Sequence, residues 1–295
     1  MTAGSGKAEP APRLFCFGLG FSARALAERL MARGWHVAGT TRSAERAAAL
    51  AAQGIGVFLF DRGRPLDDAA AALAGTTHLL SSVPPDAEGD PVIDQHGPDL
   101  AALTDLSWAG YLSTTGVYGD RGGGWVDEDS TLEPTGERGR RRVAAEAAWL
   151  ALERQPVHLF RLAGIYGPGR NALETVRAGR ARRIDKPGQV FSRIHVTDIA
   201  SVLEASIAKP NPGAAYNVCD DQAAPPEAVI AHACELLGAE PPPLIPFEEA
   251  ELSPMGRSFY RDNKRVSNRR IKEELGVALA YPDYRAGLAA LLAAG

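Results

Sequence analysis

The stretch "LFCFGLGFSARALAERL", residues 14–30, decides the fold. It joins a short apolar run at 14–18 to a segment in which apolar residues recur at helical spacing. Gly18, Gly20 and Ala23 form the pattern G-x-G-x-x-A at this junction. The first glycine permits a tight turn, the second lets a pyrophosphate approach the backbone, and the small third residue lets helix and strand pack closely. The pattern predicts a dinucleotide site, with a small-residue turn that binds nothing as the alternative.

Residues beside this junction are expected to contact the cofactor. Phe21 and Ser22 lie at the start of the helix, whose free N–H groups bind phosphates. The second predicted strand, 35–42, runs into Thr41-Arg42-Ser43, where a site that prefers NAD usually has an acid. Arg42 can pair with a 2′-phosphate, and Thr41 or Ser43 can donate a hydrogen bond to it. We therefore expect NADP(H) as the preferred cofactor and NAD(H) as the second choice, unless Arg42 is a solvated surface residue.

The next two predicted strands also end in candidate cofactor residues. Asp61 ends the strand at 55–61, and its carboxylate either accepts from the adenine amino group or starts a loop. Ser82 and Val83 lie near the end of the strand at 77–85, at the sheet edge where the cofactor is expected.

Strands and helices alternate through the first half of the chain. Further strands are predicted at 109–115 and 156–167, and helices at 43–54, 65–74, 96–106 and 138–154. This alternation predicts an α/β fold with a Rossmann-like, doubly wound parallel sheet. We expect a disordered tail at 1–12, an NAD(P)-binding domain at 13–166, and a smaller C-terminal α/β substrate region at 167–295, partly interleaved with the first.

Composition excludes several other classes of protein. The 295 residues are 45% apolar and 23% charged with a formal charge of −4, so neither nucleic acid nor a membrane is expected as partner. Cys16, Cys219 and Cys234 lack metal-binding spacing, so we expect reduced thiols, no metal and a cytoplasmic protein. The "GSGK" at 4–7 lacks the Ser or Thr that follows the lysine of a phosphate loop.

Four more segments accompany the glycine loop in a fixed order: "STTGVYG" (113–119), "RLAGIYGPGR" (161–170), "IHVTDIA" (194–200) and "AAYNVCD" (214–220). As a set they resemble the short-chain dehydrogenase/reductase superfamily, in the extended or atypical branch often named NAD-dependent epimerase/dehydratase. The resemblance implies a small-molecule substrate held over the nicotinamide, between the Rossmann-like domain and the C-terminal region. It also implies a homodimer formed through helices that include 138–154, although this arginine-rich helix disfavours such pairing.

The resemblance carries catalytic roles to specific positions. It places Thr114, with Thr115 beside it, where the family has the serine or threonine that polarises a substrate oxygen. The register of the family's Tyr-x-x-x-Lys motif falls on Arg138 and Arg142. Arginine cannot exchange protons near neutrality, because its pKa lies above about 12. This chain therefore departs from the family's acid/base chemistry.

Other residues are candidates to replace the missing tyrosine. Arg138 and Arg142 are four apart on one helix face and suit a carboxylate, phosphate or oxyanion, unless they belong to a solvated basic stripe. Tyr118 and Tyr166 are candidate displaced proton donors or structural residues. His195 titrates near neutrality when unperturbed, but a structural role at a helix entry is favoured.

Four charged residues have less specific assignments. Arg193 and Arg265 either hold an anionic substrate or face solvent. Asp94 and Asp99 flank the region where the family has a supporting asparagine, and the sequence does not choose between them.

Two functions follow. The first is an NADP(H)-binding, atypical oxidoreductase or epimerase that acts on a small carbonyl, hydroxyl or sugar-type substrate. The second is a non-catalytic NADP(H)-binding redox sensor or regulatory protein. The missing Tyr and Lys favour the second function, whereas Thr114, Tyr118 and the C-terminal region favour the first.

Overall fold

The structure, a computed structural model, describes residues 11–295. The predicted disordered tail at 1–12 falls almost wholly outside the described residues. The core of the molecule is a seven-stranded sheet in the order β11-β7-β5-β4-β1-β2-β3. All neighbouring strands in it are parallel. Its strands are β1 (Arg13–Phe17), β2 (His36–Thr41), β3 (Gly56–Leu59), β4 (His78–Ser81), β5 (Trp108–Thr114), β7 (Val157–Leu162) and β11 (Ala215–Val218).

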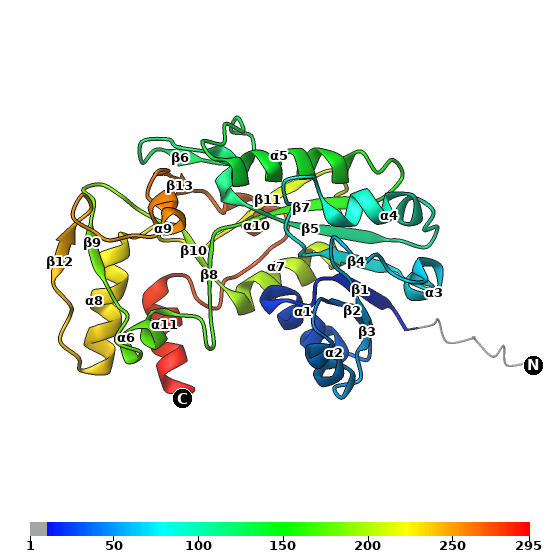
Figure 1. Cartoon of the computed structure of the whole chain (residues 1–295), viewed down its shortest axis with the longest axis horizontal. Coiled ribbons are helices and arrows are strands. Elements are labelled where there is room, and N and C mark those ends of the chain that lie inside the picture. The colour runs from blue at the N-terminus through cyan, green and yellow to red at the C-terminus, as the bar shows by residue number, and fades with distance from the viewer. Residues whose placement is uncertain (1–10) are drawn as a thin grey trace, which may run out of the picture.

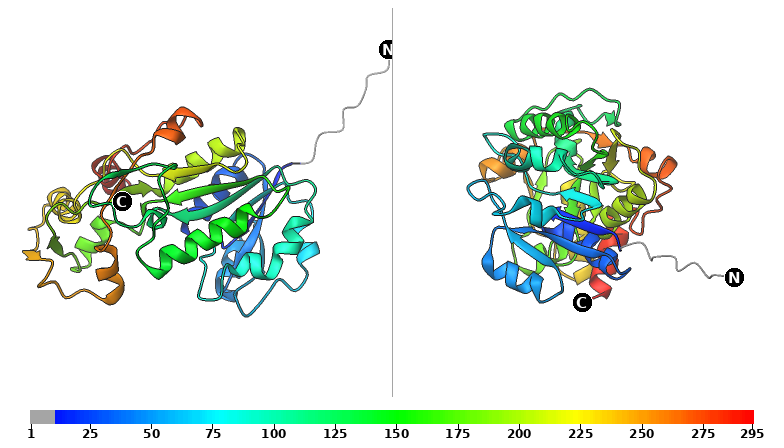
Figure 2. Two further views of the ribbon diagram at one scale, coloured as in Figure 1. Left: turned by 90° about the horizontal axis from the view of Figure 1, so that it is seen from above. Right: turned by 90° about the vertical axis from the view of Figure 1, so that its right-hand side faces the viewer.

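Helices cover both faces of this sheet, as Figures 1 and 2 show. One face packs against α1 (Phe21–Met31), α2 (Ala44–Ala51) and α7 (Val196–Ala208). The other packs against α3 (Ala69–Leu73), α4 (Pro91–Ala101) and α5 (Glu137–Leu150). The predicted Rossmann-like, doubly wound parallel sheet is thus confirmed.

The alternation of side chains along β1 explains why a sheet covered on both faces forms. Leu14 and Cys16 belong to the core on the α1 side, and Phe15 and Phe17 to the core on the α5 side. All four side chains are fully buried. Burying each large apolar side chain contributes roughly 1.5–3 kcal/mol, so the strand is stabilised from both faces.

A smaller region lies beyond the carboxyl ends of the central strands (Figure 1). Its helices are α6 (Ala172–Arg177), α8 (Pro226–Leu237), α9 (Pro254–Phe259), α10 (Arg269–Glu273) and α11 (Tyr284–Ala293). Short parallel strand pairs join them: β8 (Gly164–Tyr166) with β10 (Arg193–His195), β9 (Arg183–Asp185) with β12 (Leu244–Pro246), and β6 (Trp125–Val126) with β13 (Arg265–Val266). Strand β11 and helix α7 return to the central sheet, so the two regions share elements.

The single strand predicted at 156–167 is wrong, because the chain forms two strands there. The N–H of Ala163 still donates to the Val218 carbonyl oxygen of the central sheet. The N–H of Gly164 donates instead to the Ser192 carbonyl oxygen, just before β10. The backbone changes partner at Gly164, and β8 leaves the sheet.

The helix predicted at 96–106 begins earlier, at Pro91. The Asp90 carboxylate caps it by accepting from the N–H groups of Val92 and Ile93, and Pro91 occupies the first turn, where its missing N–H costs nothing. Helix α4 ends at Ala101, so residues 103–106 lie outside it.

Candidate functional site

The glycine loop has the geometry of a phosphate-binding turn. Gly18 has a φ of 82°, in the left-handed region that favours glycine. Its N–H donates to Thr40 Oγ1 at 2.8 Å, and its carbonyl oxygen accepts from Ser82 Oγ at 2.5 Å. Helix α1 then begins at Phe21, with Gly20 as its N-cap and no side chain capping it. The first N–H groups of α1 are therefore left for an anion.

Space around the loop also fits a dinucleotide. A Cβ on Gly18 would lie 2.9 Å from Ser82 Oγ and 3.2 Å from Val83 Cγ2, so the two residues that follow β4 close one side of the loop. A Cβ on Gly20 would meet only Ser82 Oγ, at 3.8 Å, so Gly20 leaves room for a ligand. Ala23 is fully buried in the core between α1 and the sheet. The fold thus brings Gly18 together with Ser82 and Val83, the residues after β4 that the sequence singled out.

The end of β2 holds the predicted residues for the adenosine ribose. Arg42 is exposed and Thr41 is partly buried. Ser43 caps α2 by accepting from the Arg46 N–H at 3.2 Å, which leaves its hydroxyl proton free to donate. Arg46 Nη2 donates to the Leu19 carbonyl oxygen at 3.1 Å, so a second guanidinium stands beside the glycine loop. Sequence reasoning missed Arg46, although its place in the first turn after the Ser43 cap is a usable signal.

Asp61 lies just after β3 and is engaged in a local turn. Its Oδ1 accepts from the Gly63 N–H at 2.9 Å. Its neighbour Arg62 binds Asp86 through two hydrogen bonds of 2.8 Å, and Asp94 through one of 2.6 Å. Arg62 therefore ties the loop after β4 to α4, and the Asp61 carboxylate keeps one free oxygen.

Asp94 and Asp99, the candidates near the family's supporting asparagine, have other partners. Asp94 forms the ion pair with Arg62, and Asp99 lies 2.9 Å from His96 Nδ1. Both carboxylates are about 40% exposed. Neither is directed to Thr114, so the structure gives no support to either assignment.

Thr114 lies where β5 ends, at the carboxyl edge of the sheet. It caps the 3-10 turn η1 (Thr115–Tyr118), and its Oγ1 accepts from the Gly116 N–H at 3.2 Å. Thr114 and Thr115 are both partly buried. A Cβ on Gly139 would lie 2.8 Å from the Gly116 carbonyl oxygen, so α5 passes directly over this turn. The Thr114 hydroxyl proton is free to donate to a ligand.

Arg138 and Arg142 do not form the pair of ligand-facing cations that their spacing predicts. Arg142 Nη1 donates to Tyr111 Oη at 2.9 Å and to the Leu112 carbonyl oxygen at 2.7 Å, which directs this side chain onto β5. Arg138 is exposed, and its guanidinium carbon lies 5.6 Å from the centre of the Phe259 ring. Of the two, only Arg138 stands free at the boundary with the smaller region.

Tyr118 is enclosed rather than presented to a substrate. Its hydroxyl donates to Asn217 Oδ1 at 2.7 Å and accepts from Arg161 Nη1 at 2.9 Å. The side chain is fully buried, and burial raises the pKa of Tyr118 to about 12. This placement argues against Tyr118 as a displaced proton donor and gives it a structural role.

A buried ion pair anchors this part of the site. Arg161 on β7 binds Glu146 on α5, with Nη2 and Oε2 2.9 Å apart, and both side chains are at most 6% exposed. Ser113, next to Thr114, donates to Glu146 Oε1 at 2.5 Å. Glu146 therefore joins α5 to β5, the strand that ends in Thr114, and to the neighbouring β7.

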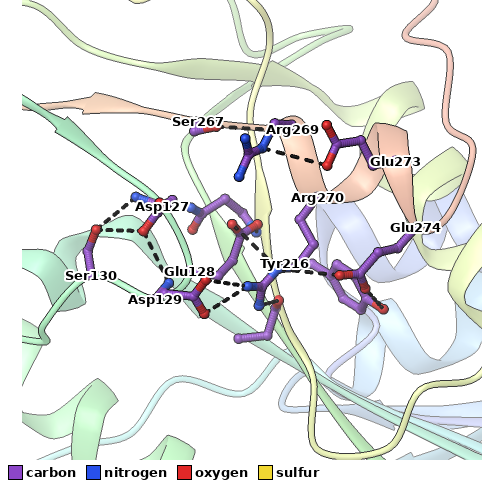
Figure 3. A network of polar contacts seen from close by, with 12 residues as sticks. Asp127, Glu128, Asp129, Ser130, Tyr216, Ser267, Arg269, Arg270, Glu273 and Glu274 are labelled. Atoms are coloured by element: carbon purple, nitrogen blue, oxygen red, sulfur yellow. Dashed lines mark hydrogen bonds and ion pairs between the residues drawn. The ribbon is translucent and has the colours of Figure 1, made fainter.

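The polar network continues outward to the surface (Figure 3). Glu128 Oε1 accepts from the Asn217 N–H at 2.8 Å. Arg270 lies between Asp129, at 2.8 Å, and the more distant Glu128 and Glu274. These residues line a recess of about 130 Å³ between the β6 turn and α10, and no predicted site residue lies in it.

His195 and Tyr166 are also enclosed. His195 Nδ1 accepts from the Thr197 N–H at 3.2 Å, so the histidine is the N-cap of α7. Its ring packs 5.1 Å from that of Tyr166 and 4.2 Å from that of Tyr281. Burial lowers the pKa of His195 to about 4, so the imidazole is neutral at physiological pH. The expected structural role at a helix entry agrees with this placement.

Metal and membrane features are absent from the described part of the chain. Residues 11–295 contain no group of three His, Cys, Asp or Glu side chains that could hold a metal ion. Within the same range, no helix is long and apolar enough to cross a membrane. Cys16, Cys219 and Cys234 are buried and unbonded.

Comparison with known proteins gives close and distant relatives, although no family model matches the chain. A functionally unknown conserved protein from Silicibacter pomeroyi is 53% identical, with a TM-score of 0.91, over 96% of this chain and 99% of that one. A proposed NAD-dependent epimerase/dehydratase from Methylobacillus flagellatus is 28% identical, with a TM-score of 0.73, over 96% and 98% of the two chains. Protein YeeZ of Escherichia coli K12 is 28% identical over 90% of this chain and 95% of its own length.

A more distant structure was solved with ligands. The UDP-glucuronic acid 4-epimerase of Bacillus cereus, bound to UDP-glucuronic acid and NAD, is 14% identical with a TM-score of 0.77, over 95% and 98% of the two chains. At this identity the likeness concerns the fold alone.

Proposed function

We propose that the chain, whose central sheet and overall architecture resemble those of a solved epimerase/dehydratase structure, is an atypical NADP(H)-binding oxidoreductase or epimerase of the extended short-chain dehydrogenase/reductase type. Its substrate is a small molecule with a carbonyl, hydroxyl or sugar group. The proposed setting is the cytoplasm, which suits three buried free thiols.

The geometry of the glycine loop carries this proposal. Thr40 and Ser82 hold Gly18 by its N–H and its carbonyl oxygen, and α1 begins without a side-chain cap. A loop fixed from both neighbouring strands, with unused N–H groups at its helix, is preorganised for a pyrophosphate. A turn that only connected two elements would need neither the open space at Gly20 nor the free helix end.

The preference for NADP(H) rests on charge at the end of β2. Arg42 is exposed, and no described residue forms an ion pair with it. Arg46 adds a second guanidinium whose Nη2 is held at the Leu19 carbonyl oxygen. Two cations and the Ser43 hydroxyl suit the double negative charge of a 2′-phosphate better than the neutral ribose of NAD.

The substrate is proposed to lie against Thr114, between the sheet edge and the smaller region. The chemistry that a nicotinamide cofactor would supply, when bound beside Thr114, is the transfer of a hydride to or from the substrate. Thr114 donates a hydrogen bond from its free hydroxyl to the substrate oxygen and stabilises charge that develops there. In reduction of a carbonyl, the proton that the substrate oxygen gains would come from water, because Tyr118 and His195 are enclosed.

A second function, from a different class, is favoured by one observation. The resemblance places Arg138 and Arg142 in the register of the family's Tyr and Lys, and Arg142 donates hydrogen bonds to Tyr111 Oη and the Leu112 carbonyl oxygen. The nicotinamide edge thus lacks the usual acid. This arrangement supports a non-catalytic NADP(H)-binding redox sensor, which needs the cofactor site but no proton donor.

Turnover separates the two functions. Purified protein is assayed for NADPH oxidation against a panel of small carbonyl compounds, and for conversion of nucleotide sugars to their epimers, which consumes no net cofactor. Thr114→Val and Thr114→Ser are assayed beside the unaltered chain. The enzyme proposal expects turnover that falls about 100-fold or more in Thr114→Val and survives in Thr114→Ser. Tight NADPH binding without turnover on any substrate would favour the sensor.

A further inference from the structure

Trp125 on β6 is a large aromatic side chain that the fold leaves uncovered. It is 66% exposed, whereas Trp108 and Trp149 are fully buried and Trp35 is partly buried. A single exposed apolar residue is ordinary on a protein surface. Tryptophan, however, is enriched among the residues that dominate binding interfaces, above all where it borders a recess. The surroundings of Trp125 therefore decide whether it marks a binding surface.

Strand β6 has a free edge at Trp125. Arg265 on β13 lies opposite Trp125, and its N–H donates to the Gly124 carbonyl oxygen at 2.9 Å. Arg265 is thus the hydrogen-bonded member of the pair, so the backbone N–H and C=O of Trp125 point to the outer edge. Within the described chain, this sheet contains only β6 and β13, which lie side by side in Figure 1. An extended segment of another protein can pair with such an edge as an added strand.

Two recesses adjoin this edge. The outer recess, of about 270 Å³, is lined by Trp125, Val126, Asp127, Ser267 and Arg269. The inner recess is the one of about 130 Å³ between the β6 turn and α10 (Figure 3). Asp127, Ser267 and Arg269 belong to both linings. A segment that lies on the Trp125 edge can therefore place a side chain in the inner recess.

The inner recess carries an excess of negative charge. Its lining has five carboxylates and two guanidinium groups, from Asp127, Glu128, Asp129, Glu273, Glu274, Arg269 and Arg270. Arg270 forms one short ion pair, with Asp129 at 2.8 Å. Its distances to two further carboxylates are 3.6 and 3.9 Å, so three acids share a single guanidinium. The recess therefore attracts a positively charged group.

Glu128 supplies an acceptor in the inner recess that the chain leaves unused. Its side chain is only 3% exposed, and Oε1 accepts from the Asn217 N–H at 2.8 Å. Within residues 11–295, Oε2 makes no hydrogen bond, because Arg270 Nε is 3.9 Å away. Buried carboxylate oxygens normally have a donor. An N–H group of a ligand can supply the missing one.

We propose that the β6 edge and its two recesses bind an extended segment of a partner protein that carries arginine or lysine. The segment pairs with the free backbone groups of Trp125. One of its cations lies over the indole ring, and a second enters the inner recess and donates to Glu128 and Asp127. Arg265 does not oppose this charge, because its Nη1 donates to the Gly123 carbonyl oxygen and it lines neither recess.

A dye-labelled synthetic peptide in which arginine alternates with threonine is the probe. Alternation places all its arginines on one face of an extended chain. The control peptide has glutamate in place of arginine. Fluorescence anisotropy should show that the basic peptide binds, more weakly as salt is raised, and that the acidic peptide does not. Binding of the unlabelled basic peptide should also shift the emission of Trp125, the most exposed of the four tryptophans.

Two variants of the surface are compared with two matched controls. We expect Trp125→Ala to weaken binding of the basic peptide about tenfold, and Asp127→Asn to weaken it severalfold. Asparagine keeps the Oδ1 that accepts from Ser130 Oγ, so the turn after β6 is retained. Leu150→Ala and Asp105→Asn alter exposed residues outside both recesses and should change nothing. All four variants should keep the NADPH affinity of the unaltered chain, so this test does not depend on the proposed function.

Four results would overturn the proposal. The unaltered chain does not bind the basic peptide, or it binds the acidic peptide equally well. Trp125→Ala binds the basic peptide as tightly as the unaltered chain does, which would reduce the binding to a general charge effect. Sedimentation shows that the chain self-associates and that Trp125→Ala abolishes the association, which would assign this surface to a second copy.

Discussion

Ser82 Oγ donates a 2.5 Å hydrogen bond to the carbonyl oxygen of Gly18, and it stands 2.9 Å from where a Cβ on that glycine would lie. The same hydroxyl thus fixes the turn and excludes any larger residue from it. Because Ser82 directly follows β4 and Gly18 directly follows β1, the turn is set by the parallel pairing of these two strands.

Gly18→Ala is expected to abolish NADPH binding. The new methyl group meets Ser82 Oγ, and the φ of 82° costs an L-residue about 1–2 kcal/mol. Gly34→Ala is the matched control, because Gly34 has a φ of 81° but no atom within 4 Å of the position that a Cβ would take. Urea unfolding should show a similar decrease in the free energy of unfolding for both variants, and only Gly18→Ala should lose NADPH binding. If Gly18→Ala keeps its affinity for NADPH, the glycine loop is not the cofactor-binding site.

Arg42→Ala is expected to lower NADPH affinity about tenfold or more and to leave NADH affinity unchanged, because only NADPH carries the 2′-phosphate. Arg46→Ala should act in the same direction with a smaller effect, since its Nη2 is shared with the Leu19 carbonyl oxygen. Calorimetric titration gives the ratio of NADPH affinity to NADH affinity, and Arg180→Ala, a change at an exposed arginine of the smaller region, is the control. An unchanged ratio in Arg42→Ala would contradict the assignment.

Glu146→Gln is expected to destabilise the fold by about 3–5 kcal/mol, because it leaves the buried charge of Arg161 without its anion. The double variant Glu146→Gln/Arg161→Met should recover part of this loss, since it removes both charges. Glu28→Gln breaks an exposed pair with Arg24 and should cost no more than about 0.5 kcal/mol. Urea unfolding measures all three. A loss in Glu146→Gln as small as that in Glu28→Gln would show that the pair contributes little.

Asp220→Asn is expected to change how stability depends on pH. The folded-state pKa of Asp220 is raised from 3.8 to about 7, so the folded state binds this proton more tightly than the unfolded state. Its contribution to stability is present below pH 4 and is lost as pH rises through about 7. Asparagine keeps the oxygen that accepts from the Gln222 N–H and carries no charge.

The measurement is the free energy of unfolding at pH 5 and pH 8, for Asp220→Asn and for the unaltered chain. Only their difference isolates Asp220, because His195, with its lowered pKa, contributes stability that is lost as pH falls. The free energy of unfolding of Asp220→Asn minus that of the unaltered chain should be larger at pH 8 than at pH 5. A difference that does not vary with pH would contradict the raised pKa.

Local patterns predicted the central fold and the position of the glycine loop at the first strand–helix junction. The glycine spacing and the alternation of strands with helices involve neighbours in sequence, and their meaning does not depend on distant contacts. The start of α4 could also have been predicted from local sequence, because Asp90 is a common N-cap residue and Pro91 is favoured in the first turn of a helix.

The arrangement of residues on the proposed substrate side of the site depends on tertiary contacts, which cannot be read from the sequence. The spacing of Arg138 and Arg142 predicted a shared face, but the Tyr111 hydroxyl and the Leu112 carbonyl oxygen on β5 draw Arg142 away. The change of strand partner at Gly164 likewise depends on Ser192, 28 residues further along the chain. The sequence did not distinguish Arg193 from Arg265. In the structure, Arg193 donates to the carbonyl oxygens of Phe191 and Ala224, whereas Arg265 donates to that of Gly123.

Calorimetric titration of the purified chain with NADPH and with NADH tests the central claim most directly. We predict binding of both, with NADPH at least about tenfold tighter, since the glycine loop accepts either pyrophosphate and the arginines after β2 accept only the 2′-phosphate. Binding of neither cofactor would contradict the account, because a loop held open by Thr40 and Ser82 would then have no ligand.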